Sequence, residues 1–97
     1  MTYNVKYSTF FLKDLTLIED YLAQFSKTAF SRFINVLHSR IENVKENPMM
    51  YAVYPFAPQY RHIVIDKYVA IYRLIEKNNT IYFYRLLHGA LNIPDFL

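Results

Sequence analysis

Residues 60–89, YRHIVIDKYVAIYRLIEKNNTIYFYRLLHG, contain three apolar runs separated by two turn signals. The runs are rich in Ile, Val and Tyr, the residues that favour strands. One turn is expected near Asp66 and the other at Asn78-Asn79, because asparagine tolerates positive φ. The segment therefore predicts three consecutive antiparallel strands, at residues 60–65, 68–75 and 80–88.

The chain before this segment carries two helical patterns. Apolar residues recur every three or four positions over 11–25 and again over 30–44, which is the period of an amphipathic helix. Ser8 stands where its hydroxyl can cap the first helix. The second helix should stop by Asn47, because Pro48 disfavours helical geometry in the residue before it. The two patterns predict an αα-hairpin.

A short strand and an extended connection complete the predicted fold. Apolar and polar residues alternate over 3–7, as in a half-buried strand. Three prolines within 48–59 exclude a regular helix or central strand there, and the apolar content of that segment predicts that it packs as a crossing. The expected order is β-α-α-β-β-β. This is an α+β fold with an antiparallel sheet and the helix hairpin on one face, as a single domain over residues 1–97.

Composition excludes several classes of protein. The chain has no cysteine, so disulfide scaffolds and thiolate metal sites are excluded, and its three isolated histidines predict no metal or cofactor. The N-terminus lacks the pattern of a signal peptide, and no apolar run is long enough to span a membrane. A reducing cytoplasm is the expected location. The net charge is +3, and the excess of positive charge lies in residues 60–89. This part of the chain would favour an anionic target.

Both faces of the predicted sheet are largely apolar, although the helix pair can cover only one. The odd positions hold the three strand arginines, so we assign them to an open face and the even, tyrosine-rich positions to the helices. The open face would then expose Ile63, Val69, Ile71, Phe83 and Leu87. An apolar patch of this extent usually marks a binding surface, here for a partner. The alternative is that the segment 48–59 folds over this face.

The basic residues of the strands are candidates for binding an anionic target. They are Arg61, Arg73, Arg85 and His88. Arg61, Arg85 and His88 would also be the residues available to a nuclease. The alternative for Arg85 is an ion pair at a strand edge, with Asp95 as its partner. His62, Tyr84 and His88 share the parity of the helix-covered face, which favours hydrogen-bonded core residues over an acid–base set.

Several segments together resemble the RelE/ParE toxins of bacterial type II toxin–antitoxin systems. The matching segments are YNVKYS at the start, the second helix ending in Asn-Pro, and the strands YRHIVID, YVAIYRLIE and IYFYRLLHGALN. The last strand, with Arg85, two leucines, His88 and Gly89, is the most distinctive. The resemblance covers nearly the whole chain. It implies the β-α-α-β-β-β fold, growth inhibition, plasmid stabilisation and a cognate antitoxin, with operator DNA bound only through that antitoxin.

The resemblance also separates two possible targets. The RelE branch cleaves mRNA on the ribosome, and of five residues that it uses only Arg61 has a match here. Ile63, Val69 and Leu91 stand where that branch has basic residues, and no tyrosine follows Gly89. The ParE branch inhibits DNA gyrase without a recognised catalytic set, and the final strand fits it better. The expected function is therefore gyrase inhibition without catalysis. The alternatives are a ribosome-dependent mRNA endoribonuclease with a degenerate site and a non-toxic antitoxin-binding homologue.

Overall fold

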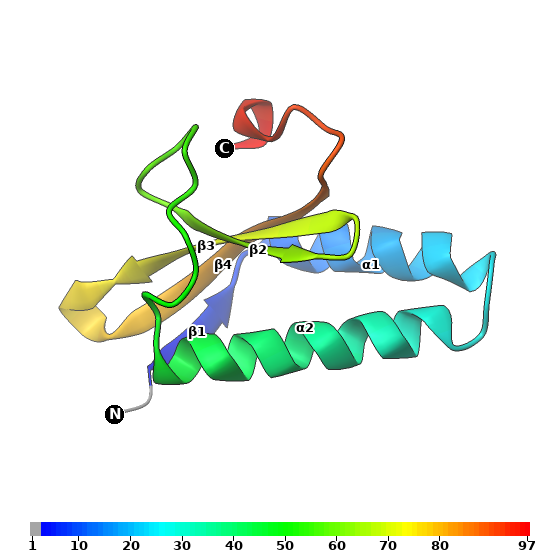
Figure 1. Ribbon diagram of the computed structural model, residues 1–97, viewed down its shortest axis with the longest axis horizontal. Helices are drawn as coiled ribbons and strands as arrows, with labels where there is room; N and C mark the ends of the chain where they lie inside the picture. Colours follow the sequence, from blue (N-terminus) through cyan, green and yellow to red (C-terminus); the bar gives the residue numbers. More distant parts are fainter. Residues whose placement is uncertain (1–2) are drawn as a thin grey trace.

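The order of elements in the computed structural model, which describes residues 3–97, is the predicted β-α-α-β-β-β (Figure 1). Both helices and all four strands lie close to their predicted positions. The elements are β1 (Asn4–Tyr7), α1 (Thr9–Ala23), α2 (Ala29–Glu46), β2 (Arg61–Ile65), β3 (Tyr68–Ile75) and β4 (Thr80–His88), with 3-10 turns at Glu76–Asn78 and Ile93–Phe96. The predicted α+β fold class is confirmed.

The sheet has the order β1-β4-β3-β2. The pairs β2·β3 and β3·β4 are antiparallel, as predicted, and their turns contain Asp66 and Asn79 at positive φ. β1 instead pairs with β4 in parallel, with Val5 opposite Ile81. The sheet is therefore mixed rather than wholly antiparallel, because alternation in a sequence predicts a strand but not its direction.

The predicted start of the first helix and the predicted end of the second are confirmed. The Ser8 hydroxyl accepts a hydrogen bond from the Phe11 N–H at 2.9 Å, which satisfies a free donor of the first turn of α1. α2 ends at Glu46, directly before Asn47 and Pro48. Phe25, the last member of the first apolar pattern, lies beyond the end of α1 and is 68% exposed, so its expected place in the core is wrong.

The main core lies between the helix pair and one face of the sheet. α2 and α1 contribute the buried stripe that their periodicity predicts, and all three meander strands contribute one face. Its largest fully buried members include Phe11, Leu37, Tyr72 and Phe83. Burying side chains of this size supplies roughly 1.5–3 kcal/mol each, which makes this layer the dominant apolar contribution to folding.

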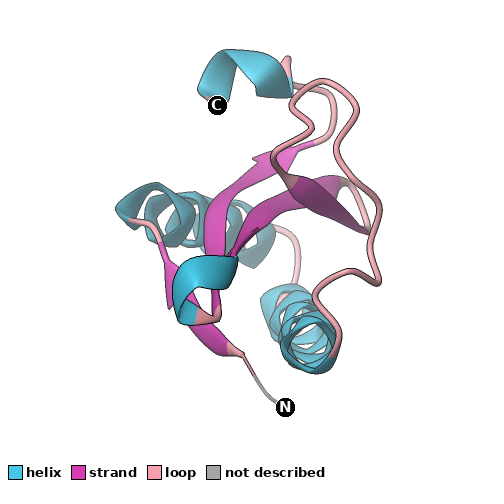
Figure 2. Ribbon diagram, turned by 90° about the vertical axis from the view of Figure 1, so that its left-hand side faces the viewer, coloured by secondary structure: helices cyan, strands magenta, loops and turns pink. Residues whose placement is uncertain are grey.

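The opposite face of the sheet is covered by a second, smaller core. The 48–59 segment contributes Tyr54 and Ala57, and the C-terminal turn contributes Ile93. These pack on Ile71 and Leu87 of the sheet. Figures 1 and 2 show the segment and the C-terminal turn on the side of the sheet away from α2. The alternative that the 48–59 segment covers this face is therefore confirmed.

A β-bulge decides which residues of β4 face the helices. Ile71 pairs with Arg85, whereas the next residue, Tyr72, pairs with Phe83, so Tyr84 is an extra residue without a partner in β3. The extra residue inverts the alternation. Odd positions before the bulge face the helix pair, and even positions after it do so.

The expected exposed face of five apolar residues is wrong. Ile63 and Phe83 lie in the core under the helices. The turn after β2 and the bulge in β4 each make the odd-numbered residues at these positions face the helices, whereas in β3 the even-numbered residues do so. Ile71 and Leu87 lie on the expected face but are buried by the segment and tail above it. Val69 also lies there and is half-buried. No open apolar sheet face exists at these positions.

Tyr72 links the sheet to the first residue of the 48–59 segment, because its buried hydroxyl donates a hydrogen bond to the Pro48 carbonyl at 2.8 Å. Burial raises the pKa of the Tyr72 phenol to about 12, against an opposing effect of nearby Arg61. Folding thus favours the neutral phenol. The stability that it contributes is present below the unfolded pKa near 10 and is lost as the pH rises toward about 12.

Tyr72→Phe should therefore flatten the alkaline pH dependence of stability. At neutral pH it should cost about 1 kcal/mol for the lost hydrogen bond. Between pH 7 and pH 11 the wild type should lose about 1 kcal/mol more than the variant. Urea unfolding at both pH values measures this, with the exposed Tyr21→Phe as control. Equal losses in wild type and variant would contradict it.

Candidate functional site

α1 closes an edge of β4 that no strand covers. β1 ends at Tyr7, opposite Phe83, so the rest of β4 has no neighbour on that side. The Ser8 N–H bonds the Phe83 carbonyl, and its hydroxyl donates to the Tyr84 carbonyl. Further along α1, the Asp14 carboxylate accepts the Leu86 N–H at 3.0 Å. The helix thus supplies the hydrogen bonds that a fifth strand would otherwise make.

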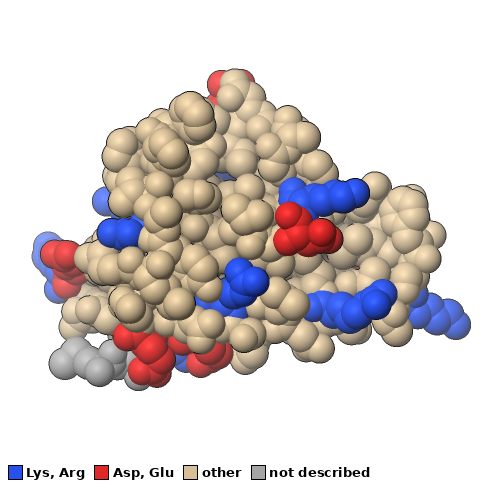
Figure 3. Space-filling view, in the orientation of Figure 1, with Lys and Arg blue, Asp and Glu red and all other residues tan. Residues whose placement is uncertain are grey.

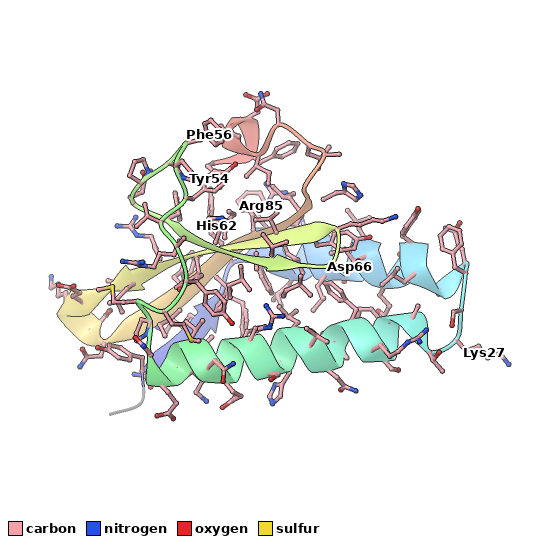
Figure 4. All side chains as sticks on the ribbon, viewed as in Figure 1. Lys27, Tyr54, Phe56, His62, Asp66 and Arg85 are labelled. Carbon is pink, nitrogen blue, oxygen red and sulfur yellow. The ribbon has the colours of Figure 1, made fainter. Side chains whose placement is uncertain are left out.

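Arg85 is held by the same carboxylate. Its guanidinium donates two hydrogen bonds to Asp14, at 2.8 and 2.9 Å, and lies over the rings of Phe10 and Phe96 at 5.2 and 5.3 Å. The hydrogen bond to Asp14 raises the pKa of Arg85. The ion-pair alternative is confirmed, but its partner is Asp14 and not Asp95. Figure 4 shows Arg85 below the C-terminal turn, which carries Phe96.

Arg61 anchors the 48–59 segment. Its guanidinium donates to the Tyr51 carbonyl at 2.7 Å and to the Met49 carbonyl at 3.4 Å. The residue is half-buried and is opposite Tyr72 in the sheet, so it lies at the helix side rather than on the opposite face as expected. Both arginines that a nuclease would use are thus engaged in contacts that hold the fold.

The other predicted basic residues lie in separate environments. Arg73 is exposed on the face away from the helices, as expected. His88 lies on the helix side, as expected, where its ring meets Tyr68 edge-on and accepts the Ala90 N–H at 3.0 Å. His62 and Tyr84 lie instead on the opposite face. In β2 and at the start of β4 the odd-numbered residues face the helices, and Tyr84 is the extra residue of the bulge. No acid–base set is formed by these three side chains.

An exposed apolar strip runs from α1 to the 48–59 segment, and sequence reasoning missed it. Leu17 and Tyr21 are 67% and 52% exposed and line a groove of about 250 Å³ between α1 and the end of β4. Leu91 lines this groove and also a second one, which Phe56 lines as well. We call these four residues the Leu91 strip.

The strip is an unusual surface for a small protein. Phe56 is 74% exposed, and side chains this large rarely gather in the open without a partner. In Figure 3 the upper part of the molecule, where the 48–59 segment and the C-terminal turn lie, is almost uncharged. The sequence did carry a signal, because Leu17 and Tyr21 are one turn apart on α1 and lie off its buried stripe.

Within residues 3–97, no three His, Cys, Asp or Glu side chains are placed to hold a metal ion. None of the helices in this range has the length and apolar character needed to cross a membrane.

One known protein family and several solved structures are similar to this chain. The family model for the ParE toxin of the parDE type II toxin–antitoxin system matches residues 5–92. No curated protein matches the sequence. Solved structures share the fold at low sequence identity, and three of them are described below.

The chromosomal ParDE toxin–antitoxin system from P. aeruginosa aligns with a TM-score of 0.72 at 14% identity, over 90% of this chain and 96% of that one. A mutant of E. coli RelE toxin in the free state aligns with a TM-score of 0.69 at 15% identity, over 99% of this chain and 93% of that one. A chain of the intact E. coli RelBE toxin–antitoxin complex aligns with a TM-score of 0.65 at 15% identity, over 92% of this chain and 99% of that one. The family match spans nearly the whole chain, and we conclude that the chain belongs to the ParE toxin family of type II toxin–antitoxin systems.

Proposed function

We propose that this toxin acts on DNA gyrase, which it inhibits by binding without catalysis, and that a cognate antitoxin neutralises it. The match to the ParE family over residues 5–92 carries the proposal. Plasmid stabilisation would follow from such a pair when it is carried on a plasmid.

The contacts of the arginines support gyrase over the ribosome as the target. Cleavage of RNA needs cationic groups free to stabilise the phosphate and groups that move protons. Arg61 is bonded to backbone carbonyls and Arg85 to Asp14. Ile63 is fully buried in the core, and Leu91 presents an apolar surface where the RelE branch has a basic residue. The alternatives are a RelE-like mRNA endoribonuclease with a degenerate site and a non-toxic homologue that only binds the antitoxin.

The antitoxin is expected to cover the Leu91 strip. The strip is long, apolar and interrupted by two grooves, which suits an amphipathic segment that places large side chains at intervals. The similar structures from P. aeruginosa and E. coli include complexes of a toxin with its antitoxin. Operator DNA would be contacted through the antitoxin.

Three measurements separate the candidates. Induced expression of the chain should arrest growth, and expression of the antitoxin should restore it. The purified chain should then inhibit supercoiling by gyrase and leave mRNA on ribosomes uncut. Cleavage of ribosome-bound mRNA without an effect on gyrase would support the nuclease instead, and the absence of growth arrest would support the non-toxic homologue.

A further inference from the structure

A row of three side chains crosses the sheet on the face away from the helices. In the register of the sheet, Lys6 of β1 and Arg73 of β3 are both partners of Tyr82 of β4. Tyr82 lies between Ile81 and Phe83, which both face the helix core, so its own side chain lies on the opposite face. Lys6 and Arg73 are exposed, and Tyr82 is half-buried. The row therefore places an aromatic ring between two cations.

Two further tyrosines extend this surface. The ring of Tyr84, the extra residue of the bulge, lies 6.3 Å from that of Tyr82. The Tyr84 ring also stacks on that of Tyr60, with ring centroids 5.7 Å apart and planes within 14° of parallel, and meets the Phe10 ring of α1 edge-on at 6.2 Å. The Arg73 guanidinium lies 5.9 Å from the centre of the Tyr60 ring. We call Lys6, Tyr60, Arg73, Tyr82 and Tyr84 the tyrosine platform.

The platform has binding capacity that the fold does not use. Over residues 3–97, neither Lys6 nor Arg73 forms an ion pair, and the hydroxyls of the three tyrosines make no hydrogen bond. The second core, around Ile71 and Leu87, is covered by the 48–59 segment and the tail, but Lys6 and Arg73 remain exposed beside it. Aromatic rings alone would be enough to shield the sheet from water. The two cations beside them, which form no ion pair within residues 3–97, are not needed for that purpose.

We propose that the tyrosine platform binds single-stranded nucleic acid. Unpaired bases stack on aromatic rings, and lysine and arginine neutralise the phosphates between them. In a duplex the base faces are already stacked on one another, so this surface could contact only its backbone. The site uses neither Arg61 nor Arg85 and includes no group placed for cleavage. The proposal goes beyond gyrase inhibition and does not depend on it.

The test is fluorescence anisotropy of labelled oligonucleotides with the purified chain. The probes are oligo(dT) and oligo(U) of about 10 nucleotides and a duplex of the same length, titrated between about 50 and 200 mM salt. The single strands should bind more tightly than the duplex. The tighter of the two single strands then identifies DNA or RNA as the natural ligand class.

The variants separate the contribution of base stacking to affinity from the contribution of charge. Tyr82→Ala should weaken binding by roughly 5- to 150-fold, and Tyr82→Phe should retain it because the ring remains. Arg73→Ala should lower the dependence of log affinity on log salt by about 0.7, the value for one phosphate of a single strand. Lys13→Ala, an exposed cation on α1, is the matched control and should change neither quantity.

Three results would overturn the proposal. These are no binding at low salt, equal affinity for the duplex, and a loss in Tyr82→Ala no larger than in Lys13→Ala. Urea unfolding checks that Tyr82→Ala folds, and the exposed Arg73 keeps the proposal testable if it does not. The assay contains no gyrase, so its failure leaves the gyrase proposal as it stands.

Discussion

Asp14→Ala is expected to lower the free energy of unfolding by about 3–5 kcal/mol. The Asp14 side chain is 7% exposed and that of Arg85 is 14% exposed, so the pair lies largely out of water. Removing the carboxylate leaves the guanidinium and the Leu86 N–H without their acceptor. Arg85 also lies between Phe10 of α1 and Phe96 of the C-terminal turn, so its displacement should loosen both. Urea unfolding at neutral pH measures the loss.

A matched double variant distinguishes the ion pair from simple packing. Asp14→Leu with Arg85→Leu removes both charges and keeps apolar volume, so it should recover part of the loss, as apolar replacements of buried pairs often do. Arg85→Leu alone should be destabilising, because it leaves the carboxylate with one remaining donor, the Leu86 N–H. A loss below about 1 kcal/mol in Asp14→Ala would show instead that the pair behaves as a solvent-exposed one.

The secondary structure could be predicted because its causes are local. The cap at Ser8, the stop before Pro48 and the positive φ of Asn79 each depend on residues within one turn. The faces of the sheet could not be predicted in the same way. They depend on register, and the unpaired Tyr84 shifts the register of β4 by one residue. Nothing in the sequence of residues 80–88 marks Tyr84 as the residue that bulges.

The pairing of Asp14 with Arg85 had a signal that sequence reasoning did not use. Asp14 lies three residues after Phe11 and four before Ile18, on the buried stripe of α1. A carboxylate on such a stripe is rarely buried without a partner, so a cation from another element was to be expected. The identity of that cation could not be deduced, because it depends on α1 covering the free edge of β4.

Leu17→Asp is expected to weaken antitoxin binding by roughly 30-fold or more, if the antitoxin covers the Leu91 strip as proposed. Leu17 is the most exposed apolar side chain of the first groove and would be desolvated by a partner lying in it. A carboxylate there would be buried without a cation, which adds to the loss of apolar contact. Titration of the purified antitoxin into each variant measures the effect.

Thr16→Asp is the control, because Thr16 precedes Leu17 on α1, is exposed and does not line the groove. It adds the same charge and should leave binding within a few fold of wild type. Growth arrest should persist in Leu17→Asp and should no longer be reversed by the antitoxin. Leu91→Asp tests the junction of the two grooves. Because Leu91 lines both, its loss should equal or exceed that of Leu17, whereas wild-type affinity in both variants would place the antitoxin elsewhere.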